Sequence, residues 1–393
     1  MITDLASLIQ PMAEAEFIAR FVRKEFTFLS GPRDEISSLL SLTEINRLLD
    51  SEAIGPPRVR LRRDEMAFPT SFYSDPELGT LYPATIQDAL RKGASLVIDD
   101  IGPLVPRLHR LERALERRFK ERVLINAYLS FNKGGAFAAH YDNHDVLVVQ
   151  VHGRKRWQLL GAVEASAVSV KPPPKGARGP TEVSWERDIE PGDLLFIPRG
   201  GWHRAAVQGD VSIHLTITLV SRTGLDYAKW LVDQLGADDL LARDLPQLAG
   251  NAALDAHDTT VKARISEIFA RLSAQAFLAD KDGQCRTVTR FNLGEAWAPA
   301  ESDILLSTLR RPLRANAGEG AAHVEVHAGG QAHVLAPPLY AALAEIDSRD
   351  EGIGYGALKD KLADKWAADA VQAAIARLAE KGLITVRPHD WDS

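Results

Sequence analysis

The segment from Asn126 to Trp157 constrains the fold of this chain more than any other segment. It reads NAYLSFNKGGAFAAHYDNHDVLVVQVHGRKRW, with apolar runs separated by glycine-containing turns. Residues 122–220 continue the pattern as five or six short strands punctuated by Gly and Pro, which predicts a β-barrel or sandwich. The run Val146 to Val151 is nearly all apolar, as expected for a strand that is covered on both faces.

Two histidines and one carboxylate stand out within these predicted strands. His140 and Asp142 are two residues apart, so on a strand their side chains point to the same face. His203 follows a second apolar strand in PGDLLFIPRGGWHRA. Two His and one carboxylate that leave open coordination positions form the facial triad of non-heme Fe(II) oxygenases. His144 shares the parity of the first pair and is an alternative ligand, although the H-x-D order favours His140 and Asp142.

This ordered set of motifs resembles the JmjC branch of the cupin superfamily, and most of all its ribosomal oxygenase group, over about residues 95–220. Members of that group hydroxylate protein side chains with Fe(II), 2-oxoglutarate and O₂. The resemblance implies a mainly β catalytic core, a double-stranded β-helix with helical flanks. It also implies the site residues: metal ligands His140, Asp142 and His203, and contacts to 2-oxoglutarate from Lys155, Asn126, Tyr128 and Thr218.

The residues themselves leave alternatives open at the 2-oxoglutarate positions. Lys155 is the basic residue before x-Trp, and on an edge strand it would instead be an outward-facing charge. Arg154 and Arg156 have the opposite parity and should face elsewhere. Asn126 and Tyr128 share one strand face and can donate hydrogen bonds to a carboxylate, but they can equally be core polar residues that bond to backbone.

Composition narrows the class of protein. The chain has 393 residues, which is long enough for two or three domains. Its net charge of −6 does not favour binding to nucleic acid or to an anionic membrane. Its single cysteine, Cys285, excludes an intramolecular disulfide and a Cys-based zinc site. The N-terminus lacks the basic and apolar runs of a signal peptide or membrane anchor. We therefore expect a cytoplasmic protein.

Three domains are expected: a catalytic domain with N-terminal helices over 1–222, a helical region over 223–299, and a winged-helix-like α+β domain over 300–393. Helical spacing is predicted for 13–50, 225–245 and 259–278, the last capped by Asp258 or Thr259. In the resembling family, the region 223–299 holds a dimerisation bundle, so its apolar stripe favours a homodimer over packing within the chain. The stripe consists of Val261, Ile265, Ile268, Phe269 and Leu272.

The C-terminal region predicts helices over 338–346, 355–362 and 367–381, followed by a strand over 383–387. Its third helix offers only Arg377 and Lys381 against Asp369 and Glu380, so DNA binding is disfavoured. The function favoured by these observations is hydroxylation of a protein side chain, with a ribosomal protein as the expected substrate. Demethylation is a variant of it. The alternatives are the same chemistry on a biosynthetic peptide or small molecule, and a non-catalytic cupin that serves as an interaction protein.

Overall fold

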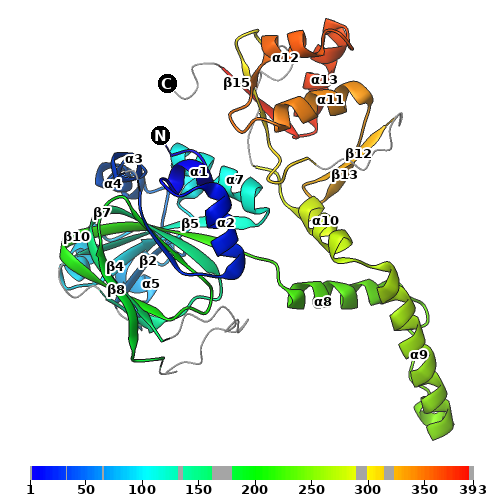
Figure 1. Cartoon of the computed structure of the whole chain (residues 1–393), viewed down its shortest axis with the longest axis horizontal. Coiled ribbons are helices and arrows are strands. Elements are labelled where there is room, and N and C mark those ends of the chain that lie inside the picture. Colours follow the sequence, from blue (N-terminus) through cyan, green and yellow to red (C-terminus); the bar gives the residue numbers. More distant parts are fainter. Residues whose placement is uncertain are drawn as a thin grey trace. The chain divides into compact units, whose positions relative to one another are not determined.

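The computed structural model describes residues 2–31, 33–63, 66–131, 136–161, 179–288, 299–313 and 323–388. The chain divides into two compact units, Met1–Ser221 and Arg222–Ser393 (Figure 1). The finer division of the second unit into residues 223–299 and 300–393 stays a prediction. The sequence KPPPKGARGP at 171–180 predicts a basic, proline-rich loop, and most of it lies outside the described residues.

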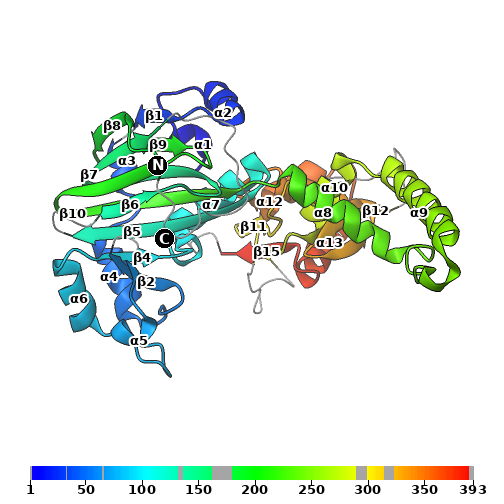
Figure 2. The same ribbon diagram turned by 90° about the horizontal axis from the view of Figure 1, so that it is seen from below.

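The first unit is built on one large antiparallel sheet. The strand order is β1-β9-β7-β10-β5-β4-β2-β3, with β6 paired to β10 and β8 paired to β7, and the order from β1 to β2 can be followed in Figure 2. The bounds are β1 (Thr27–Ser30), β2 (Val59–Arg63), β3 (Met66–Ala67), β4 (Ser95–Ile98), β5 (Arg122–Phe131), β6 (Ala136–His140), β7 (Asp145–Leu160), β8 (Val183–Ile189), β9 (Asp193–Ile197) and β10 (His203–Val220). The predicted mainly β core is confirmed.

The two central strands are longer than the sequence predicted. β7 has 16 residues and β10 has 18, because both pass through irregularities in their pairing instead of ending there. The expectation that Val146 to Val151 is covered on both faces is confirmed: Leu147 and Val149 belong to a core beneath the helices, and Val146 and Val148 belong to a second core on the opposite face.

Helices flank this sheet. Their bounds are α1 (Leu5–Leu8), α2 (Glu14–Arg23), α3 (Arg33–Ser37), α4 (Leu42–Asp50), α5 (Thr70–Tyr73), α6 (Pro83–Arg91), the 3₁₀ turn η1 (Gly102–Leu104) and α7 (Pro106–Phe119). The expectation of helix throughout 13–50 is wrong at Thr27–Ser30, which pairs with β9. In that segment the β-forming Thr-Phe-Leu run gains a partner strand, and tertiary pairing outweighs the helical spacing around it.

The second unit begins with helices and ends in an α+β region. Its bounds are α8 (Gly224–Asp233), η2 (Gln234–Ala237), η3 (Gln247–Ala249), α9 (Asn251–Arg271), α10 (Ala274–Gln284), β11 (Ile304–Ser307), β12 (Val324–Ala328), β13 (Gln331–Leu335), α11 (Pro337–Asp347), β14 (Ile353–Gly354), α12 (Tyr355–Leu362), α13 (Ala368–Glu380) and β15 (Ile384–Arg387). The last three helices and the final strand agree with the prediction. A single helix over 259–278 is wrong, since Ser273 caps a new helix there.

The α+β region holds a three-stranded sheet, β14-β11-β15, and a separate hairpin, β12–β13, that the sequence did not predict. Leu343, Leu358 and Ile375 are buried together from its three helices. Whether this arrangement acts as a winged helix stays a prediction. Among the described helices, none combines the length and the apolar character that a membrane crossing requires.

Candidate active site

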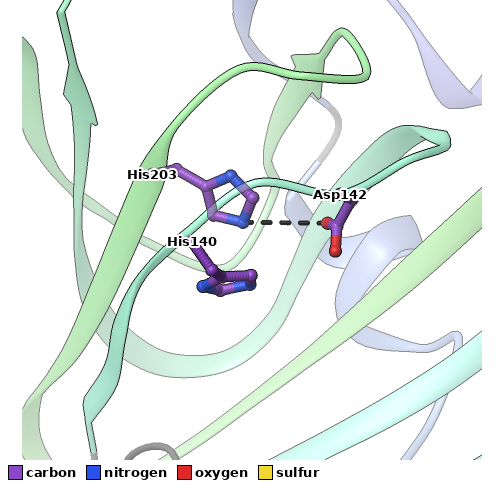
Figure 3. Close-up of side chains that lie close together, drawn as sticks. All are labelled: His140, Asp142 and His203. Carbon is purple, nitrogen blue, oxygen red and sulfur yellow. Dashed lines mark ion pairs between the residues drawn. The ribbon is translucent and has the colours of Figure 1, made fainter. Parts of the chain in front are cut away.

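His140, Asp142 and His203 meet at one end of the large sheet (Figure 3). His140 ends β6 and His203 begins β10, and the two residues are direct partners across the antiparallel pair. Asp142 lies just beyond β6, not on the strand as the H-x-D spacing implied. One ligand atom from each side chain lies within 4.8 Å of the others, which is the separation expected of three groups that share one ion.

The turn between β9 and β10 brings Asp142 and His203 together. The Gly200 N–H donates to the backbone carbonyl of Asp142 at 2.8 Å, and the Gly201 N–H donates to Pro198 at 3.0 Å. Gly200 has a φ of +82°, a backbone conformation that favours glycine. The Asp142 Oδ2 atom then lies 3.8 Å from the Nε2 atom of His203.

Both imidazoles present Nε2 towards the common point. The Nδ1 atom of His140 bonds to the Ala138 carbonyl at 2.8 Å, and that of His203 bonds to the Gly201 carbonyl at 2.9 Å. A carbonyl only accepts, so Nδ1 carries the proton and Nε2 keeps its lone pair for a metal. Burial, and then the neighbouring His140, lower the pKa of His203 to about 4 against the opposing effect of Asp142. His203 is therefore neutral at physiological pH, the state in which imidazole coordinates metal.

A cavity of about 150 Å³ extends from this triad into the sheet. Lys155 on β7 lines it and is fully buried, with Nζ 3.5 Å from the hydroxyl of Ser130. Burial lowers the pKa of Lys155 from 10.5 to about 7. The alternative of an outward-facing charge is therefore wrong for Lys155, while Arg154 and Arg156 on either side of it are exposed, as expected.

Three further side chains from β5 and β10 line the same cavity. Tyr128 stacks on His214 with ring centroids 4.8 Å apart, and Thr216 follows His214 on the same strand face. Burial raises the pKa of Tyr128 to about 12, and Asp142 adds to the effect. Burial, and then Lys155, hold the pKa of His214 well below its usual range. Both groups are therefore neutral at physiological pH.

Asn126 and Thr218 share the parity of these residues but do not line the cavity. The side-chain oxygen of Asn126 accepts a hydrogen bond from the Asp100 N–H at 2.8 Å, which is the backbone-bonded alternative that the sequence left open. Thr218 pairs with Val146 and Leu124 one step further along β10. Thr216 is the hydroxyl residue of this strand that lines the cavity.

A β-bulge on β7 decides which of its residues reach the cavity. Val146 and Val148 line it together with Lys155 and Trp157, although an unbroken strand would place odd and even residues on opposite faces. The pairing with β10 slips by one residue between Gln150 and His152, and this slip exchanges the two faces. At Gly153 an added Cβ would lie 1.9 Å from the Val211 carbonyl oxygen, so the strands approach closely only because this residue is glycine.

Sequence reasoning missed two arginines of β2. Arg60 and Arg62 line the cavity, and Arg60 forms a two-pronged ion pair with Asp99. Their alternation with the buried Val59 and Leu61 is typical of a half-buried strand. The missing information was that β2 pairs with β4, which places the polar face of β2 beside the cavity.

Residues 104–227 match the family model described as JmjC domain. The Dictyostelium discoideum protein named bifunctional lysine-specific demethylase and histidyl-hydroxylase NO66 is 31% identical over 146 residues, which cover 36% of this chain and 28% of that protein. A Drosophila pseudoobscura pseudoobscura protein of the same name is 27% identical over 220 residues, covering 54% of this chain and 22% of that protein. The matches thus span under a third of these relatives' own length.

Among solved structures, the Escherichia coli ribosomal oxygenase YcfD matches with a TM-score of 0.57 and 18% identity, over 96% of this chain and 98% of that chain. A structure of YcfD in complex with cobalt and 2-oxoglutarate matches with a TM-score of 0.55, 17% identity and the same coverage. Residues 104–227 are therefore similar to a JmjC domain, and the chain shares its fold with YcfD.

Proposed function

We propose that this JmjC-domain chain is an Fe(II)- and 2-oxoglutarate-dependent dioxygenase that hydroxylates a side chain of a protein. One observation carries the proposal. A complete His-Asp-His donor set and a fully buried lysine line the same small cavity. The donor set suits a non-heme Fe(II) centre, because two neutral imidazoles and one carboxylate leave positions for further ligands.

We assign the residues as follows. His140, Asp142 and His203 hold the iron, and Lys155 pairs with the far carboxylate of 2-oxoglutarate. Tyr128 and Thr216 are placed to hydrogen-bond the same acid, while Asn126 and Thr218 support the wall behind them. Bound iron with 2-oxoglutarate and O₂ supplies the oxidation, in which one oxygen atom enters a substrate C–H bond and the other enters succinate as CO₂ is released.

The charges of the site favour a dianionic ligand such as a 2-oxo dicarboxylic acid. A ferrous ion bound by Asp142 carries one net positive charge, and protonated Lys155 adds a second. A dianionic 2-oxo acid neutralises both. Burial lowers the pKa of Lys155, and a dianionic ligand beside its amino group would favour the protonated form.

Cavity size favours a protein substrate over a free small molecule. Sites for small molecules usually enclose about 300–1,000 Å³, whereas this cavity has about 150 Å³. That volume suits one short dicarboxylate beside the metal, so the group to be oxidised must enter from the surface. A single side chain on a larger partner meets this requirement. The names of the NO66 relatives and of YcfD point in the same direction, with a ribosomal protein as the expected substrate.

A homodimer formed through residues 223–299 is part of the proposal. None of the 21 residues of α9 is buried, and its stripe of Val261, Ile265, Ile268, Phe269 and Leu272 is left partly exposed. Leu248 and Val232 nearby are largely exposed as well. An isologous contact would cover this surface. The winged-helix-like C-terminal region is proposed as a protein-contact module, and a reducing cytoplasm suits both ferrous iron and the single cysteine.

Mass spectrometry tests the proposed activity. The protein is incubated with ribosomal proteins, Fe(II), 2-oxoglutarate and O₂, and peptides are searched for the gain of one oxygen atom. We expect a gain that requires 2-oxoglutarate and disappears in Asp142→Ala. Release of formaldehyde with loss of a methyl group would point to demethylation instead. If no substrate is oxidised and no 2-oxoglutarate is consumed, the non-catalytic alternative is correct.

A further inference from the structure

The second unit contains a cavity of about 350 Å³ between the end of α10, the segment that follows β11, and the β12–β13 hairpin. Its lining includes Asp282 and Gly283 of α10, Arg310 and Arg311 after β11, and His327 on β12. It lies in a different unit from the JmjC cavity and shares no residue with it.

The walls of this cavity are firmly joined. The N–H groups of Gly329 and Gly330, in the hairpin turn, donate to the carbonyls of Cys285 and Gly283 at 3.0 and 2.9 Å. Both turn glycines have positive φ. A Cβ added at Gly283 would lie 2.9 Å from the Cβ of His327, so the helix and the hairpin are in direct contact. The cavity is therefore a formed feature of this unit.

Arg311 is the distinctive group in the lining. It is 8% exposed, and its nearest carboxylate oxygen is Oδ1 of Asp282, 3.6 Å from Nε. That same oxygen already accepts a hydrogen bond from Nη1 of Arg222 at 2.8 Å. Among the described residues, Nε of Arg311 has no hydrogen-bond partner, and Nη1 bonds only to the Arg310 carbonyl at 3.2 Å. One carboxylate thus faces two guanidinium groups.

Asp280, the other acidic residue of the lining, is bonded to other groups and does not pair with Arg311. Oδ2 of Asp280 accepts hydrogen bonds from Trp230 at 2.8 Å and Gln284 at 3.0 Å, and it lies 3.9 Å from Lys281. His327 is paired with Glu325 at 2.7 Å. A buried guanidinium whose hydrogen bonds are incomplete is costly, and a second oxyanion beside Arg311 would complete them.

We propose that this cavity binds a small oxyanion ligand, a phosphate or carboxylate group that is held by the guanidinium of Arg311. Arginine suits this role because its planar fork matches both groups with paired hydrogen bonds. Asp282, which is fixed by its hydrogen bond from Arg222, lies beside this guanidinium. Because α10 and the hairpin both line the cavity, the ligand stabilises the junction between the helical segment and the α+β region.

Titration of the full-length protein tests the site. Inorganic phosphate and acetate are used as probes, in a chloride-containing buffer that lacks other oxyanions, and binding is followed by calorimetry. We expect saturable binding of at least one probe with a Kd of about 1 mM or below. Preference between the probes identifies the head group. Amide hydrogen exchange over residues 274–288 and 299–313 should slow when the preferred probe is added, and this readout needs no variant.

Variants then assign the binding to Arg311. Arg311→Met should lower the affinity about tenfold or more, as expected for loss of a charge-assisted hydrogen bond, while Arg311→Lys keeps the charge and part of the affinity. Arg243→Gln, at an exposed position outside the cavity, is the matched control and should bind as the wild type does. The proposal is wrong if the wild type binds neither probe saturably. It is also wrong if Arg311→Met leaves the affinity and the exchange protection unchanged. Arg311→Lys is used for this comparison if Arg311→Met does not fold.

Discussion

Replacing the buried lysine of the JmjC cavity should make the metal-free protein more stable. Lys155 is fully buried, and burial lowers its pKa from 10.5 to about 7. In the unfolded chain this lysine is protonated below about pH 10.5, whereas in the folded state it is protonated only below about pH 7. The wild type therefore loses stability as the pH falls from 10.5 to 7, and the loss is complete below pH 7.

The size of the effect follows from the pKa shift. One pKa unit corresponds to about 1.4 kcal/mol, so the penalty is about 4 kcal/mol at pH 7 and about 1 kcal/mol at pH 10. Lys155→Met removes it while keeping an unbranched side chain of similar length. The contact to Ser130 is lost, but Ser130 keeps its 2.7 Å hydrogen bond to Ser95. We expect a net gain of about 2–4 kcal/mol at pH 7.

Urea unfolding measures this gain, with chelator present and 2-oxoglutarate absent, at pH 7 and pH 10. Trp157 lies in the same cavity, and with Trp230, Trp297, Trp366 and Trp391 of the second unit replaced by Phe in every protein compared, tryptophan fluorescence reports the transition of the first unit. Lys92→Met is the matched control, because Lys92 is exposed at the end of α6, and its effect should stay within about 0.5 kcal/mol. A Lys155→Met protein that is less stable than the wild type at pH 7, or whose gain is equal at the two pH values, would refute the reasoning.

Three further outcomes are expected. His140→Ala or Asp142→Ala should abolish turnover and sharply weaken Mn(II) binding in calorimetry while the protein still folds, and unchanged metal affinity in both would exclude the proposed ligand set. Lys155→Ala should weaken the binding of 2-oxoglutarate by about 1.5–3 kcal/mol without changing the affinity for Mn(II). Lys155→Arg should retain part of the affinity for 2-oxoglutarate. Charged residues at Ile265 and Phe269 should yield monomers by light scattering, whereas a wild-type mass of one 43.1 kDa chain would exclude the dimer.

The sequence predicted that His140, Asp142 and His203 come together, because short motifs at the strand ends place these side chains. Alternating apolar residues indicated the strands, and P-x-G-x-x-H placed His203 directly after the turn that Gly200 makes possible. The carboxylate position required more than spacing. Asp142 lies beyond β6 and is held by a backbone hydrogen bond from Gly200, a contact between segments that strand periodicity alone does not encode.

The rest of the cavity depended on long-range pairing. Tyr128 and Lys155 were identified from a family resemblance, whereas Arg60 reaches the cavity only because β2 joins the sheet through β4. The family resemblance implied Thr218. Strand alternation gives Thr216 the same face, so periodicity alone does not decide which of the two reaches the cavity. In the second unit, the stop between α9 and α10 at Ser273 was missed because apolar spacing continues across it.

The bulge on β7 shows how a strand irregularity and a functional charge depend on each other. With regular alternation from Val146 onward, Lys155 would face away from the cavity, towards the side where Leu147 and Val149 pack against other apolar residues. The one-residue slip before Gly153 turns it into the cavity beside the His-Asp-His set. There its charge costs the empty protein about 4 kcal/mol at pH 7, which a bound dianion would offset. A purely structural cupin core gains nothing from that cost, so the position of Lys155 argues for the cosubstrate-binding enzyme over the non-catalytic alternative.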